Sequence, residues 1–281
     1  MTRLDHVSRA TEFREINLAG RLLLPNAWDA ASARVFEEAG FPAIATTSAG
    51  IAYARGLRDG QLIERNAMVR EIASIVAACQ RPVSADIEAG YGPASSDVAE
   101  TVDAVLEVGA VGVNLEDNTG GVGQTPLFSV EDQASRIAAA RSRAERRGVP
   151  LVINARTDTF LLGLGTDLEE RVAMTIERGR AYLQAGADLV FVPLAIDPDI
   201  VRQLADAIGP ISVMAVPGAP AADVLFTAGA RRVSLGAAAM LATLGALREI
   251  AKEVHEAGTW TLIERSFYPF HEAQALFDRR T

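Results

Sequence analysis

The sequence predicts a single (β/α)8 barrel over residues 1–281, in which residues 258–281 form a C-terminal helical extension. Eight short apolar runs alternate with segments of helical periodicity, a pattern typical of parallel βαβ units. A glycine precedes six of these runs, at the position where the end of a helix favours a left-handed residue. Eight such units in about 250 residues favour a closed barrel. A doubly wound open sheet is the alternative.

The eight runs follow one another without a linker or a low-complexity segment. In chain order they are RLLLPNAW (21–28), FPAIATT (41–47), RPVSADIE (81–88), AVGVNLED (110–117), VPLVINART (149–157), ADLVFVP (187–193), PISVMAV (210–216) and ARRVSL (230–235). Ser129 and Asp132 resemble a capping box that opens a helix over 131–147. The stretch after Gly258 is longer than barrel closure requires, so we expect it to pack elsewhere, with another subunit as one alternative.

Composition describes an acidic chain with enough apolar residues, 49%, for a large core. The net charge of −9 argues against nucleic acid as a partner, because phosphate binding needs a basic surface. No apolar run reaches the roughly 20 residues of a membrane span, and the N-terminus lacks the apolar region of a secretory signal. The single cysteine, Cys79, excludes an internal disulfide. We therefore expect a cytoplasmic globular protein with neither a membrane nor a nucleic acid as its partner.

Polar side chains gather at the carboxyl ends of three consecutive runs, where a barrel of this kind has its active site. Each run ends in two polar residues spaced two apart, and such a pair shares one face of a strand. The pairs are Asp86 with Glu88, Asn114 with Glu116, and Asn154 with Arg156. Converging carboxylates suit a hard divalent cation, Mg²⁺ or alternatively Mn²⁺. The arginine would supply a planar partner for a substrate carboxylate or phosphonate.

Each of these residues also has a structural alternative. A lone acid at the end of a strand is commonly a helix cap or an ion-pair partner, and Arg156 could simply neutralise Asp86 or Glu116. The occurrence of such pairs on three consecutive strands favours a site. The three histidines show no metal-ligand spacing. Cys79 lies at the end of a helix, before the strand that follows it, and is predicted to be a packed thiol rather than a nucleophile.

The chain resembles the isocitrate lyase/phosphoenolpyruvate mutase superfamily from about residue 22 to residue 247. The resemblance is carried by the segments TTSAGIA, GLRDG, DIEAGYG, GVNLEDN, NARTD and SVMAVPGAP. It implies a (β/α)8 barrel, often with its last helix exchanged between the subunits of a tetramer. It also implies Mg²⁺ and small 2-oxo or 2-hydroxy acid substrates that react through a pyruvate-like enolate.

The resemblance also implies roles for individual residues. It gives four acids at the metal site, which are Asp59, Asp86, Glu88 and Glu116. It makes Arg156 the substrate-binding arginine, and it makes a turn at residues 48–50 the backbone cradle for the substrate's carboxylate and keto oxygens. The expected substrate contacts are therefore Ser48, Ala49, Gly50, Asp86, Asn154 and Arg156, and the expected catalytic residues are Asp59, Glu116 and Arg156.

Departures from the superfamily pattern bear on the reaction. The lyase branch has a catalytic cysteine in a loop after the fourth strand, but here the loop DNTGGVGQTPLF (117–128) contains no Cys, Lys or His. The phosphonate branch has a lysine where Asn118 stands. It also has an asparagine or threonine further along the loop, and Thr125 could substitute for that residue. Leu194 stands where lyases have an acid. Glu88 and Ala89 replace an aspartate and a threonine of the metal motif.

Three hypotheses about function remain open. The first is a Mg²⁺-dependent lyase that cleaves a C–C bond in a small 2-oxo or 2-hydroxy acid. An oxaloacetate-like substrate tolerates the missing loop cysteine best, because release of CO₂ needs no external general acid. The second is a mutase or hydrolase that acts on the C–P bond of phosphonopyruvate or a relative. The third, of another class, is a non-catalytic paralogue that binds 2-oxo acids.

Overall fold

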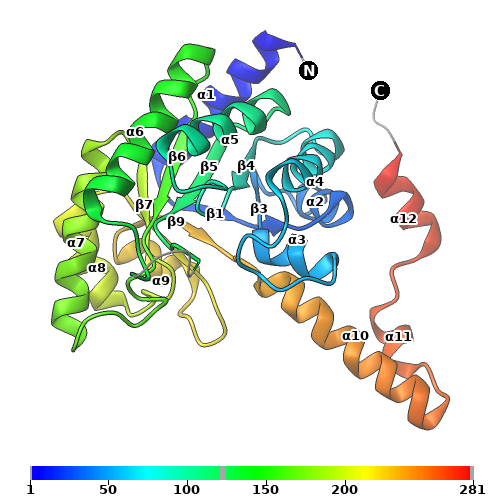
Figure 1. The fold of residues 1–281 in the computed structure, drawn as a ribbon. Helices are drawn as coiled ribbons and strands as arrows, with labels where there is room; N and C mark the ends of the chain where they lie inside the picture. The colour runs from blue at the N-terminus through cyan, green and yellow to red at the C-terminus, as the bar shows by residue number, and fades with distance from the viewer. Residues whose placement is uncertain (1, 121–124, 279–281) are drawn as a thin grey trace.

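The computed structural model describes residues 2–120 and 125–278, shown in Figure 1. Its strands are β1 (Leu22–Leu24), β2 (Asn26–Ala27), β3 (Ile44–Thr46), β4 (Val83–Asp86), β5 (Gly112–Glu116), β6 (Val152–Arg156), β7 (Leu189–Phe191), β8 (Ile211–Met214) and β9 (Ala230–Ser234). Its helices are α1 (Arg3–Ala19), α2 (Ala30–Glu38), α3 (Ser48–Ala54), α4 (Arg65–Ala78), α5 (Ser95–Glu107), α6 (Val130–Arg147), α7 (Leu168–Gln184), α8 (Pro198–Ile208), α9 (Ala222–Thr227), α10 (Ala238–Ala257), α11 (Thr261–Ser266) and α12 (Phe270–Phe277).

The strands form one parallel sheet in the order β1-β9-β8-β7-β6-β5-β4-β3-β2, which curls into a barrel (Figure 1). Each predicted run contains a strand, so the predicted (β/α)8 barrel is confirmed. The first run is divided at Pro25, which lacks an N–H and cannot continue a ladder on both sides. Its first half pairs with β9, and its second half pairs with β3. The divided strand thus links the two edges of the sheet.

Local sequence signals explain where the helices start and stop. The six predicted helix-end glycines all have a positive φ, between 68° and 113°. That conformation is the one which residues with a Cβ avoid. The hydroxyl of Ser129 accepts a hydrogen bond from the N–H of Asp132 at 3.0 Å, so α6 begins where the sequence predicted. None of the helices in the described ranges is long and apolar enough to cross a bilayer.

Helix α1 covers the amino ends of the strands. His6 on α1 is 2.9 Å from the carbonyl oxygen of Ala110, which lies just before β5. Phe13 is completely buried, and a Cβ at residue 112 would lie only 2.6 Å from its ring. Gly112 is therefore required for the close approach of α1 to β5. This apolar contact closes the end of the barrel that is remote from the polar strand ends.

The C-terminal segment lies outside the barrel. Helix α10 projects away from β9, and α11 and α12 continue it (Figure 1). The guanidinium of Arg34 on α2 donates to the carbonyl oxygen of Leu276 at 2.6 and 2.9 Å, which fixes α12 beside α2. Several large apolar side chains of this segment are exposed in the single chain, namely Leu241, Leu244, Leu247, Val254, Trp260, Phe267 and Phe270. Helices α10, α11 and α12 thus form a helical arm with exposed apolar surface.

The packing of α1 generates a prediction. Truncation of the buried ring in Phe13→Ala should lower the free energy of unfolding by about 3–5 kcal/mol, because it removes apolar contacts and leaves a cavity. The control is Leu4→Ala on the same helix, where the side chain is 83% exposed and a change of at most about 0.5 kcal/mol is expected. Urea unfolding followed by circular dichroism measures both. Equal effects of the two substitutions would contradict the role of Phe13.

Candidate active site

The carboxyl ends of β4, β5 and β6 place the predicted polar pairs around one mouth. Asn114 lies opposite Asn154 in the sheet register, and Glu116 lies opposite Arg156. Nη1 of Arg156 is 2.6 Å from Oε2 of Glu116. The pairing of residues two apart is therefore correct for β5 and β6. The structural alternative for Arg156, an ion pair with Glu116, is therefore present.

The pairing is wrong for β4, because this strand ends at Asp86. Glu88 has a φ of 48° and Tyr91 a φ of 60°, so the chain turns through left-handed conformations instead of continuing as a strand. The turn still keeps the two acids together, since the N–H of Glu88 is 3.3 Å from Oδ1 of Asp86. Two non-glycine residues with positive φ in one short turn are costly, and such conformations cluster at functional sites.

Asp86 is held by the segment that follows β3. Oδ2 of Asp86 accepts hydrogen bonds from the N–H of Ser48 at 3.0 Å and from its hydroxyl at 2.8 Å. Ser48 starts the short helix α3, and Thr47 caps that helix by accepting from the N–H of Gly50 at 3.3 Å. A Cβ at residue 50 would lie 2.6 Å from Thr47 and 3.0 Å from Trp28. In the predicted cradle of Ser48, Ala49 and Gly50, the N–H groups of the first and third residues thus bond side chains of the protein.

Glu88 and Asp59 occupy the rim next to Asp86. The hydroxyl of Tyr91 donates to Oε1 of Glu88 at 3.0 Å, and the N–H of Gln61 donates to Oε2. Burial, with the charge of Asp86 added, raises the pKa of Glu88 to about 7. Partial desolvation and the same charge raise the pKa of Asp59. Gln61 and Tyr91 were not predicted, because their role depends on a turn that a strand pattern does not show.

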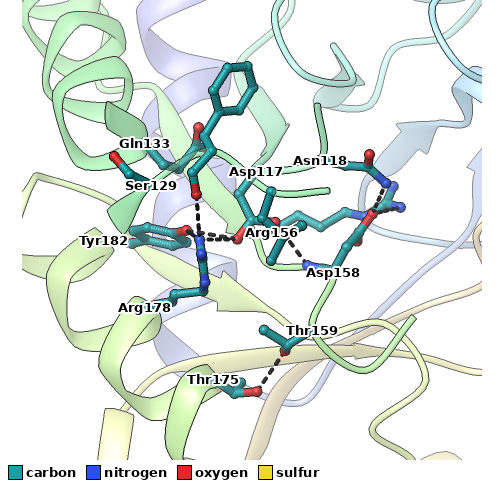
Figure 2. A network of polar contacts seen from close by, with 12 residues as sticks. Asp117, Asn118, Ser129, Gln133, Arg156, Asp158, Thr159, Thr175, Arg178 and Tyr182 are labelled. Atoms are coloured by element: carbon teal, nitrogen blue, oxygen red, sulfur yellow. Dashed lines mark hydrogen bonds and ion pairs between the residues drawn. The ribbon is translucent and has the colours of Figure 1, made fainter. Parts of the chain in front are cut away.

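Asp158 fixes the orientation of Arg156, as Figure 2 shows. Its two oxygens accept from Nε at 2.6 Å and from Nη2 at 2.9 Å, a bidentate arrangement that leaves Nη1 to Glu116. Burial opposes the charge of Arg156, but the two carboxylates together raise its pKa, so the guanidinium stays charged. Burial raises the pKa of Glu116, and Arg156 opposes that rise.

A second layer of polar contacts holds Asp158 (Figure 2). Oδ1 of Asp117 accepts from the N–H of Asp158 at 3.0 Å. Oδ2 of Asp117 accepts from the hydroxyl of Tyr182 at 2.8 Å and from Arg178 at 3.1 Å. Both donors lie on α7, so this helix positions the arginine clamp through Asp117. Burial raises the pKa of Asp117, and Arg178 opposes that rise.

The loop after β5 is tied to the same clamp. Asn118 stands where the phosphonate branch of the superfamily has a lysine. Its Nδ2 donates to Asp158 at 2.9 Å. The Thr125 hydroxyl donates within the loop, to the carbonyl oxygen of Leu127 at 2.9 Å. The glycine-rich tip of the loop, residues 121–124, lies outside the described residues. Leu194 follows β7 with a φ of 65° and is partly exposed.

Asn154 lies beneath the mouth, in the barrel interior. Its Nδ2 donates to Oδ1 of Asn114 at 2.8 Å, and its Oδ1 accepts from the hydroxyl of Ser212 at 2.8 Å. Both ends of the Asn154 amide, a predicted substrate contact, thus bond side chains of other strands. Oδ1 of Asn114 also accepts from Arg232 on β9 at 3.2 Å. These four side chains form a polar floor under the mouth.

Arg136 on α6 supports the turn that carries Glu88. Its guanidinium donates to the carbonyl oxygens of Gly92 at 2.8 Å and Pro93 at 2.6 Å, and also to that of Ala89. It stacks on the ring of Phe128, 4.1 Å from the ring centre. Arg136 is buried although it is charged. The sequence alone could have indicated its role, because Arg136 is a charged residue at a position of the buried face of α6.

Cys79 is a packed thiol, as predicted. It is buried at the end of α4, and its sulfur lies 3.4 Å from the carbonyl oxygen of Ile75. Burial raises its pKa to about 11, so the reactive thiolate is disfavoured at neutral pH.

The acids of the mouth fit a cation that keeps water ligands. Within residues 2–120 and 125–278, no three His, Cys, Asp or Glu side chains are gathered closely enough to hold an ion by themselves. The donors are oxygens throughout, and burial raises the pKa of Asp59, Glu88 and Glu116 while neighbouring carboxylates add to the rise. A cation would relieve that repulsion. Mg²⁺ suits such a set, because it takes few carboxylates and retains several waters.

The chain is similar to known proteins along most of its length. Residues 13–255 match the family model described as phosphoenolpyruvate phosphomutase. An uncharacterized protein of Mycobacterium tuberculosis is 37% identical over 235 residues, 83% of this chain and 84% of that protein. The crystal structure of a lyase/mutase candidate from Burkholderia cenocepacia is 38% identical, covers 98% of both chains and has a TM-score of 0.90. The 2-methylisocitrate lyase of Escherichia coli is 29% identical over 176 residues, 61% of this chain and 57% of that enzyme.

Two further solved structures share the fold at lower identity. Oxaloacetate acetylhydrolase in complex with its product oxalate is 23% identical, has a TM-score of 0.84 and covers 96% of this chain and 94% of that one. Phosphonopyruvate hydrolase in complex with oxalate and Mg²⁺ is 24% identical, has a TM-score of 0.81 and covers 95% of this chain and 94% of that one. At these identities the likeness shows the fold alone.

The support of the turn by Arg136 can be measured. Arg136→Met should lower the free energy of unfolding by roughly 3 kcal/mol, because three buried carbonyl groups lose their donor. Hydrogen exchange over residues 87–93 should accelerate. The matched control is Arg143→Met on the same helix, where a partly exposed ion pair with Asp103 at 3.4 Å contributes at most about 1 kcal/mol. Unchanged exchange in the turn would refute the assignment.

Proposed function

The chain belongs to the phosphoenolpyruvate phosphomutase family, within the isocitrate lyase/phosphoenolpyruvate mutase superfamily, and on that premise we propose a Mg²⁺-dependent carbon–carbon lyase. Family membership confirms the resemblance found in the sequence, and the family includes lyases, mutases and hydrolases among the relatives described above. The proposed substrate is a small 2-oxo or 2-hydroxy acid that resembles oxaloacetate. The proposed location is the cytoplasm.

The observation that carries the proposal is the clamp on Arg156 beside the acids of the mouth. Asp158 uses Nε and Nη2, so the orientation of the guanidinium is fixed, and only Nη1 faces Glu116. A substrate carboxylate can bind at Nη1 without reorienting the arginine. The entropic cost of ordering the site on binding is therefore lower. Glu116 and Asp59 are the other proposed catalytic residues.

The proposed metal ligands are Asp86, Glu88, Asp59 and Glu116, directly or through water, with Mn²⁺ as an alternative to Mg²⁺. When bound, the cation supplies positive charge for the enolate oxygen of the reacting substrate. Ser48 orients Asp86 through two hydrogen bonds, and Ala49 and Gly50 complete the proposed cradle for the substrate. Asn154 is proposed to contact the substrate from the polar floor. Its amide also donates to Asn114.

The loop after β5 favours an oxaloacetate-like substrate. It provides no Cys, Lys or His, so a reaction that requires an acid from this loop is disfavoured. In a decarboxylation the bond between C3 and the distal carboxylate breaks, and CO₂ leaves. The electron pair enters a pyruvate enolate whose remaining carboxylate Arg156 binds. A proton from water at C3 then gives pyruvate.

Chemistry at a C–P bond is the second candidate, favoured by the family model. Asn118 would then face the phosphonate, and it would have to exchange its hydrogen bond with Asp158 for that contact. A paralogue that binds 2-oxo acids without turnover is the remaining alternative.

A substrate panel tests the reaction. Oxaloacetate, methylisocitrate and phosphonopyruvate are incubated with the protein and Mg²⁺ or EDTA, and pyruvate and phosphate are measured. We expect Mg²⁺-dependent pyruvate from oxaloacetate without phosphate. Release of phosphate from phosphonopyruvate would replace the lyase by the C–P alternative. Ligand binding without turnover of any of the three would favour the binder.

The metal site has its own test. Asp86→Asn keeps the size of the side chain but removes its charge, so metal-dependent turnover should fall by at least about a hundredfold. Asp103→Asn is the matched control, because Asp103 pairs with Arg147 at 2.6 Å on the outside of the barrel. The control should retain full activity. Equal activities of the two variants would sink the assignment of Asp86.

The exposed apolar side chains of the arm lead us to propose that a second copy of this chain covers them, in a homotetramer with exchanged helices. The arm offers Trp260, Phe267 and Phe270, which are 60%, 63% and 74% exposed in the single chain. Large exposed apolar surfaces mark interaction sites. This assembly would account for an extension that the barrel core does not need.

Light scattering after size exclusion measures the assembly. We expect four chains of 29.8 kDa each for the wild type and a smaller species for the double variant Phe267→Asp/Phe270→Asp. The control Leu4→Asp places one such charge on α1, at a residue that is 83% exposed, and should leave the mass unchanged. A monomeric wild type would contradict the proposed assembly.

A further inference from the structure

Arg232 is a buried cation for which the reaction described above has no use. It lies on β9 and is only 1% exposed. Its Nη2 donates to Asn114 of β5 at 3.2 Å. Three strands separate β9 from β5 in the sheet, so the side chain must cross the interior of the barrel. The guanidinium therefore forms part of the polar floor beneath the mouth.

The charge of Arg232 is poorly compensated. In the described part of the chain, its Nε and Nη1 are buried without a hydrogen-bond partner, and none of the ion pairs within 4.0 Å includes it. Burial lowers its pKa to about 9, and the charge of Asp86 opposes that effect, so the side chain is still a cation at neutral pH. A buried charge of this kind is destabilising, and an apolar residue of similar size is commonly as stable or more stable. Packing alone therefore does not explain an arginine at this position.

We propose that Arg232 is a fixed positive charge beneath the site that weakens the binding of a divalent cation at Asp86 and strengthens the binding of an anionic substrate. This inference rests on the proposed function, since it concerns the same mouth. Arg232 touches neither ligand and acts through its field, which is strong because the barrel interior has a low dielectric constant. Its charge opposes the surplus of carboxylates above it. The two affinities should therefore respond to its removal in opposite directions.

The experiment is calorimetric titration of the full chain with Mg²⁺ alone, and then with oxalate at saturating Mg²⁺. In Arg232→Met, Mg²⁺ should bind on the order of tenfold more tightly and oxalate on the order of tenfold more weakly. Arg232→Lys keeps the charge and should restore both wild-type affinities. The melting temperature of Arg232→Met should not fall, because the variant loses an uncompensated buried charge.

The matched control is Arg141→Met. Arg141 pairs with Asp188 and donates to the carbonyl oxygen of Leu151 at 2.8 Å, at the amino end of the barrel. This variant should lose stability and keep both affinities. A damaged barrel would weaken Mg²⁺ and oxalate together, whereas a lost charge separates them.

The outcomes distinguish this inference from the proposed function. If the wild type binds Mg²⁺ but Arg232→Met binds it equally or more weakly, the role of Arg232 is overturned and the metal site stands. If oxalate binding does not weaken in Arg232→Met, the role is likewise overturned. If the wild type does not bind Mg²⁺, the proposed metal site fails, and the inference fails with it.

Discussion

Negative charge confined to the mouth of the barrel is the constraint on which the rest of the site depends. Asp86, Glu88 and Glu116 are partly or fully removed from water, and burial together with mutual repulsion raises the pKa of the two glutamates. Such a group of carboxylates persists only where donors and cations oppose it. The protein supplies them at three levels: hydroxyl and backbone donors at the acids, Arg156 between the strands, and Arg232 beneath them.

The same constraint explains why helices far from the mouth carry buried polar residues. Arg156 can be presented at a fixed angle only if Asp158 is itself fixed, and Asp117 does this with help from Arg178 and Tyr182 on α7. On the other side, α6 holds the strained turn after β4 through Arg136. These helices therefore do more than cover the sheet. They determine where the charged groups of the mouth can lie.

Much of the fold could be predicted because periodicity and helix-end glycines are local signals. The division of the first strand at Pro25 could not, since it depends on which neighbours each half finds when the barrel closes. The shared face of Asn114 and Glu116, and that of Asn154 and Arg156, followed from spacing, whereas the register that sets Glu116 opposite Arg156 did not. The position of Glu88 did not, because extended geometry was assumed beyond the last residue of β4. Arg232 sits in an apolar run that reads as an ordinary strand, and only the closed barrel shows that its side chain reaches Asn114.

The loop after β5 contacts both the residues that hold Arg156 and the residues that hold the turn of Glu88. At one end of the loop, Asn118 bonds Asp158 and so touches the arginine clamp. At the other end, the ring of Phe128 stacks on Arg136, which holds the turn of Glu88. Its two anchors therefore place this loop, which lacks the cysteine of the lyase branch, in contact with both halves of the site.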